Sequence, residues 1–146
     1  IRPQGQSESR LIQVRRALET DVVGKAARNA SPTQRAEISR LCDALLVEVY
    51  AKHPWRPADA AFHGAIYDAS GNPMFGQILS RLDHALERSA ESPFGRDEFG
   101  MDSFPPHRVL ADAIVARDPI AAVAAINHIL DIVDGEIRVI IGATAA

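Results

Sequence analysis

Asp59 and His63 are four residues apart in the segment 58–63, which reads Ala-Asp-Ala-Ala-Phe-His. Side chains at positions i and i+4 share one face of an α-helix, so this carboxylate and this imidazole can converge on one point. Placed that way, they can bind one divalent metal ion. The alternative is a simple hydrogen bond between the two side chains, which bridges one helical turn and binds nothing.

Two later histidines could complete a metal site. His107 lies at the start of a predicted helix, and His128 lies in the middle of the next one. One carboxylate with several imidazoles suits Zn²⁺, and also Ni²⁺, Mn²⁺ or Co²⁺. Four protein ligands from three helices could hold an octahedral ion and leave two positions for water or an effector. The predicted metal ligands are Asp59, His63, His107 and His128.

The segments around these residues are all predicted to be helical. A capping residue followed by proline, typical of helix N-termini, occurs at Ser31-Pro32, Asn72-Pro73 and Asp118-Pro119. No segment shows the alternation of β-branched residues that is typical of strands. Short links favour antiparallel neighbours, so we expect an all-α fold, an antiparallel bundle of about six helices. The expected helices cover about residues 9–29, 32–52, 57–69, 73–88, 105–117 and 119–141, with a loop at 89–103.

The composition is that of a soluble globular domain. The 146 residues are 47% hydrophobic and 24% charged, and the net charge is −3. A chain of this length can form one domain with a core. No apolar run approaches the roughly 20 residues that span a membrane, and no basic stripe is visible. We therefore expect neither a membrane partner nor nucleic-acid binding by the surface of this segment.

Cys42 is the only cysteine, so no disulfide can form within the chain. This fits a reducing compartment, and we expect a cytoplasmic protein. Cys42 itself is expected to be a small buried hydrophobic side chain. The two histidines outside the predicted metal site, His53 and His84, are expected to be solvated or hydrogen-bonded.

The segment with the Asp-x-x-x-His pair resembles a known signature. Residues 58–72, Ala-Asp-Ala-Ala-Phe-His-Gly-Ala-Ile-Tyr-Asp-Ala-Ser-Gly-Asn, are similar to the signature of the FCD domain. This is the C-terminal effector domain of FadR-type regulators in the GntR transcription-factor family. Residues 14–19 and 25–28 resemble its first helix, and residues 107–128 resemble its last two helices. The resemblance covers about residues 11–130.

The resemblance implies a fold and a set of ligands. It implies an all-helical antiparallel bundle, of the six-helix type. It also implies that the four predicted ligands match those of the metal-binding branch, in which many members bind a small carboxylate above the metal. Three further residues are candidates for effector binding, namely Arg15, Asn72 and Arg81.

Each of these three candidates is chosen for a different reason. Arg15 matches the family arginine that faces the cavity from the first helix. Asn72 matches the asparagine of the signature, but it is equally suited to cap the helix that begins at Pro73. Arg81 is suggested only because a guanidinium can bind a carboxylate in bidentate fashion.

One spacing departs from the family. Asp118 and His128 are ten positions apart, whereas the family usually has eleven. At 3.6 residues per turn, the missing residue rotates His128 by about 100° relative to the start of its helix. His128 keeps its place at the metal only if the start of the helix shifts.

The resemblance also implies a function. Residues 1–8 are expected to be the linker from a winged helix-turn-helix that is absent from this chain, and residues 9–146 the ligand-sensing domain. We expect a homodimer that binds a divalent metal, most simply Zn²⁺, and a small organic acid. The acid modulates DNA binding by the absent domain, and the chain is not expected to be an enzyme. Two alternatives are a metal-dependent hydrolase, with Glu19 as its candidate base, and a metal-free helical interaction module.

Overall fold

The computed structural model describes residues 4–87 and 99–145. Within these ranges the chain forms six α-helices, one short 3-10 helix and no strand, so the expected all-α bundle is confirmed. The elements are α1 (Gln4–Asn29), α2 (Pro32–Tyr50), α3 (Arg56–Ala69), α4 (Pro73–Glu87), η2 (Met101–Ser103), α5 (Phe104–Val115) and α6 (Pro119–Ala145).

Two expected helix boundaries lie elsewhere in the structure. The linker expected at residues 1–8 is helical from Gln4 on, as the first part of α1. The loop expected at residues 89–103 lies outside the described residues up to residue 98. From Phe99 it forms a turn that leads into η2.

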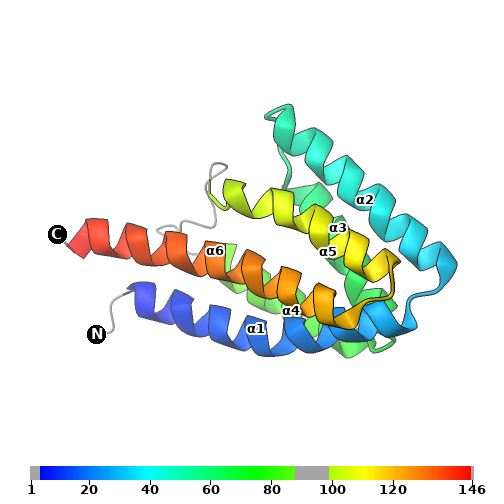
Figure 1. Ribbon diagram of the computed structural model, residues 1–146. Helices are drawn as coiled ribbons and strands as arrows, with labels where there is room; N and C mark the ends of the chain where they lie inside the picture. The colour runs from blue at the N-terminus through cyan, green and yellow to red at the C-terminus, as the bar shows by residue number, and fades with distance from the viewer. Residues whose placement is uncertain (1–3, 88–98, 146) are drawn as a thin grey trace.

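The two longest helices, α1 and α6, lie side by side and run antiparallel (Figure 1). α5 packs between α6 and α2, while α3 contacts α1, α2 and α4. Buried apolar side chains fill the space between these helices at helical spacing, for example Ile38, Cys42, Leu45 and Val49 on α2. Each large aliphatic side chain buried in this way stabilises the fold by about 1.5–3 kcal/mol.

Local capping sets where the helices start. At α2 the Ser31 hydroxyl accepts from the backbone N–H of Gln34 over 3.1 Å, and the Gln34 side chain accepts from the N–H of Ser31 over 2.9 Å. The carboxamide of Asn72 and the carboxylate of Asp118 accept from the first turns of α4 and α6. Gly71 ends α3 with a φ of 86°, which glycine adopts without strain. The three predicted helix starts are therefore confirmed.

The capping box gives a first prediction. Ser31→Ala should lower the free energy of unfolding by about 1 kcal/mol, because the N–H of Gln34 loses its acceptor. Thr33→Ala, which removes an exposed hydroxyl from the same turn, should leave stability unchanged or slightly higher. Urea denaturation followed by circular dichroism measures both variants. Equal losses in the two would contradict a specific capping role.

The burial of Cys42 gives a second prediction. Burial raises the pKa of this thiol to about 11, and the side chain is fully inside the core. Because the thiolate is the reactive form, only about one thiol in a thousand is reactive at pH 8. A disulfide reagent should label the native protein far more slowly than the urea-unfolded protein, and the native rate should rise with pH. Equal rates for native and unfolded protein would contradict this.

Candidate functional site

α3 positions the first two residues of the site. It begins at Arg56, has Pro57 in its first turn, and carries Asp59 and His63 one turn apart on one face. The i, i+4 spacing predicts this juxtaposition. The third residue, His107, comes from the first turn of α5.

A chain of hydrogen bonds holds His107 in place. Its Nδ1–H donates to the backbone carbonyl of Ser103 over 2.6 Å, and the Ser103 hydroxyl donates to the carbonyl of Gly100 over 2.5 Å. The backbone N–H of Gly100 donates in turn to Glu136 Oε2 on α6, over 2.8 Å. The imidazole is thus tied to the turn before α5 and, through it, to α6.

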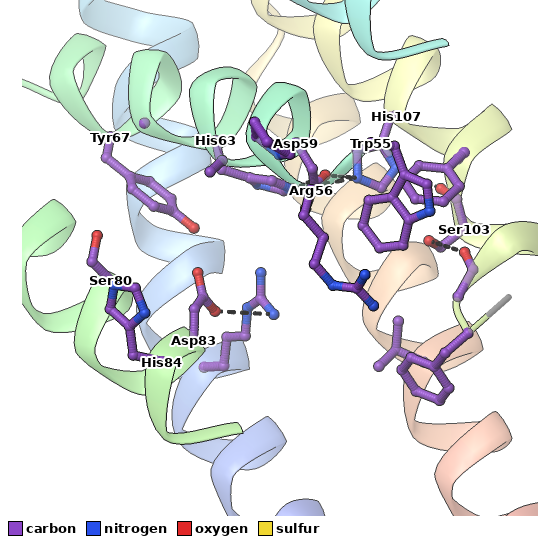
Figure 2. A pocket seen from close by; sticks show the side chains of 18 residues that line it. Trp55, Arg56, Asp59, His63, Tyr67, Ser80, Asp83, His84, Ser103 and His107 are labelled. Carbon is purple, nitrogen blue, oxygen red and sulfur yellow. Dashed lines mark hydrogen bonds and ion pairs between the residues drawn. The ribbon is translucent and has the colours of Figure 1, made fainter. Parts of the chain in front are cut away.

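The side chains of Asp59, His63 and His107, here called the triad, meet in a nearly equilateral triangle (Figure 2). His63 Nε2 lies 3.3 Å from His107 Nε2 and 3.3 Å from Asp59 Oδ1. His107 Nε2 lies 3.4 Å from the same oxygen. Ligand bonds of 2.0–2.1 Å at tetrahedral angles give an edge of about 3.3–3.4 Å. The triad therefore has the spacing of three corners of a tetrahedral ion.

The protonation of the rings suits this arrangement. A carbonyl can only accept, so the contact with Ser103 assigns the proton of neutral His107 to Nδ1 and leaves a lone pair on Nε2. The Nδ1 edge of His63 faces Glu19 Oε1 at 3.9 Å, which favours the same tautomer. Asp59 Oδ1 is buried and accepts no hydrogen bond from the described residues. Three electron-rich atoms thus face one another, and a cation among them would satisfy all three.

The pKa values of His63 and Asp59 are shifted by the charge of the neighbouring side chains. Burial by itself lowers the pKa of His63, but Asp59 outweighs burial and the net shift is upward. Burial by itself raises the pKa of Asp59, but the two histidines hold it well below its usual range. The raised pKa of His63 and the lowered pKa of Asp59 both show that this site stabilises positive charge.

A second polar group lies next to the triad, on the side of α1 and α4. Glu19 is only 1% exposed. It accepts from the Tyr67 hydroxyl over 2.7 Å and from Arg15 Nε over 3.1 Å. Arg15 Nη1 also lies 3.3 Å from Asp83 Oδ1, an ion pair drawn in Figure 2. One buried guanidinium is therefore shared by two carboxylates.

These contacts keep Glu19 ionised. Burial by itself raises the pKa of Glu19, but Arg15, His63 and the Tyr67 hydrogen bond outweigh it, so the pKa is lowered. A carboxylate held in this way is a poor general base. Glu19, the candidate base of the hydrolase alternative, is therefore poorly suited to that role.

One cavity of about 350 Å³ joins the two polar groups. Trp55, Arg56 and Phe99 line it together with the triad, and the Arg56 guanidinium lies over the Trp55 ring at 4.7 Å from its centroid. Ser80 and Asp83 line it from α4. The volume is within the range of small-ligand sites.

The structure does not bring His128 to the triad. α6 begins at Pro119, with Asp118 as its capping residue, so its start has not shifted to absorb the missing position. His128 is consequently turned to solvent, and the next residue, Ile129, is buried in its place. The rotation expected from the shorter spacing accounts for this.

Of the three candidate effector residues, one lines the cavity and two do not. Arg15 lines the cavity. Asn72 is exposed and caps α4, where its side chain accepts from the N–H of Met74 over 3.0 Å. Arg81 is exposed and is not among the residues that line the cavity.

Sequence reasoning missed several cavity residues. Tyr67 is one turn beyond His63 on the same face of α3, so its position could have been read from the spacing. Arg56, Asp83 and His84 carry no such local signal. Their placement depends on how α3 and α4 pack against α1.

No described helix is both long enough and apolar enough to cross a membrane.

Comparison with known proteins identifies the family. No curated protein matches the chain. The family model of the FCD domain matches residues 10–131, which include the triad, Arg15 and Asp83, and the six described helices agree with the six-helix type. The chain therefore belongs to the FCD family, the effector-sensing domains of GntR-type transcriptional regulators.

Proposed function

We propose that this FCD domain binds one divalent metal ion through Asp59, His63 and His107 and senses a small organic acid that binds beside the ion. The observation that carries the proposal is the triangle of three lone-pair atoms, 3.3 to 3.4 Å apart. Zn²⁺ is the first candidate, because two imidazoles and a carboxylate at tetrahedral spacing suit it. Ni²⁺ and Mn²⁺ are the alternatives.

The triad leaves room for an effector. Three protein ligands, without His128, leave at least one coordination position, and the cavity adjoins the triad. A bound ion would act there as a Lewis acid for an oxygen of the effector. Arg56 lines the same cavity, and its planar guanidinium suits a carboxylate.

Regulation would follow from linkage. A ligand that binds one arrangement of a homodimer more tightly shifts the population toward that arrangement. DNA-binding domains carried by the dimer would then be re-spaced relative to their half-sites. Exposed apolar side chains one turn apart on α4, Met74 at 53% and Ile78 at 42%, support self-association through this helix.

The metal is tested by elemental analysis of the purified protein. We expect about one transition metal per chain in the wild type, and its loss in Asp59→Ala and His107→Ala, because each variant removes one corner of the triangle. His128→Ala is the matched control and should keep its metal, because His128 faces solvent. A metal-free wild type, with all variants folded, would instead support the metal-free helical module.

The homodimer is tested by light scattering. Ile78→Asp should convert a dimer to a monomer, because it places a charge on the exposed apolar face of α4. Ile120→Asp makes the same substitution on α6, at a side chain that is 82% exposed, and it should leave the dimer intact. A wild-type monomer at all concentrations would exclude the proposed dimer.

A further inference from the structure

The α4 side of the cavity holds more negative than positive charge among the described residues. Arg15 donates through Nε to Glu19, so the two buried charges neutralise each other. Asp83 is a second carboxylate beside the same guanidinium. Its charge is in excess at this end of the cavity.

Asp83 also has an unused acceptor. Its Oδ1 is buried and receives no hydrogen bond within the described part of the chain, although Arg15 Nη1 is 3.3 Å away. Burial raises the pKa of Asp83 and Glu19 adds to the rise, while Arg15 opposes it. The Asp83 side chain as a whole is 32% exposed and lines the cavity, so a ligand there can contact this carboxylate, and a cationic donor would stabilise it most strongly.

The other side of the cavity has the opposite character. A divalent ion at the triad would exceed the single charge of Asp59, and Arg56 adds a second cationic group. That side suits a carboxylate, and the Asp83 side repels one. The cavity therefore has one end for an anion and one end for a cation.

We propose that the effector is a small amino acid, with its carboxylate at the triad and Arg56 and its ammonium group at Asp83. This rests on the proposed function, because the ion fixes the carboxylate end. An ammonium group offers three donors and a full positive charge, which match the excess negative charge of Asp83, whose side chain is 32% exposed and lines the cavity. A cavity of about 350 Å³ is large enough for a molecule of this size.

The test is calorimetric titration of the metal-loaded full chain with compounds matched in skeleton. The sets are alanine, lactate and propionate; aspartate, malate and succinate; and γ-aminobutyrate with butyrate. In at least one set the amino acid should bind at least about tenfold more tightly than its counterparts, as expected for one added charge-assisted contact.

Two variants test whether Asp83 binds the ammonium group. Asp83→Asn should bring the affinity ratio within that set to about one while the carboxylate still binds, because the ammonium group loses its charged partner and the triad and Arg56 are unchanged. Asp68→Asn, an exposed carboxylate on α3, should keep the wild-type ratio. Circular dichroism checks that both variants are folded. If Asp83→Asn is unfolded, the order of affinities that the wild-type protein shows within each set still tests the proposal.

The outcomes separate the two proposals. Equal or tighter binding of the acids without an amino group, or no binding of any amino acid in the panel, would overturn the amino-acid proposal and leave the metal site standing. A wild-type protein without metal, or an Asp59→Ala variant that keeps it, would overturn the proposed function itself.

Discussion

The whole arrangement depends on three lone pairs held within 3.4 Å of one another in a largely apolar setting. Phe62 and Phe104 pack against His107 at 5.7 and 5.3 Å between ring centroids. Such atoms repel one another unless a cation or a shared proton lies between them. α2 packs against both α3 and α5, and this packing holds the three atoms together in spite of that repulsion.

The neighbouring group around Arg15 has the opposite balance. Here the cation belongs to the protein, and Glu19, Tyr67 and Asp83 surround it from α1, α3 and α4. A buried ion pair of this kind adds little net stability, but losing one partner is costly, often about 3–5 kcal/mol. The group therefore fixes how three helices meet, and with them the shape of the cavity.

Local chemistry explains what the sequence could predict. The helix starts at Ser31, Asn72 and Asp118 depend on neighbouring residues, and so does the pairing of Asp59 with His63. Those features were therefore accessible without a structure. No local spacing predicts that His107 on α5 meets Asp59 and His63 on α3, and this expectation depends on residue types and on the family resemblance.

Tertiary packing explains what the sequence could not predict. Whether His128 reaches the triad depends on where α6 begins, and one residue of difference turns a side chain from the interior to solvent. Arg56 and Asp83 belong to the cavity only because distant segments pack around it.

The hydrogen bonds that hold His107 extend well beyond the imidazole. They pass through Ser103 and Gly100 to Glu136, so hydrogen bonds connect the His107 ring to α6, a helix of 27 residues. A displacement of the His107 ring by a fraction of an ångström would thus pull on α6, which lies along α1 (Figure 1). The long helix would act as a lever, converting a small adjustment around a ligand into movement at the far end of the bundle.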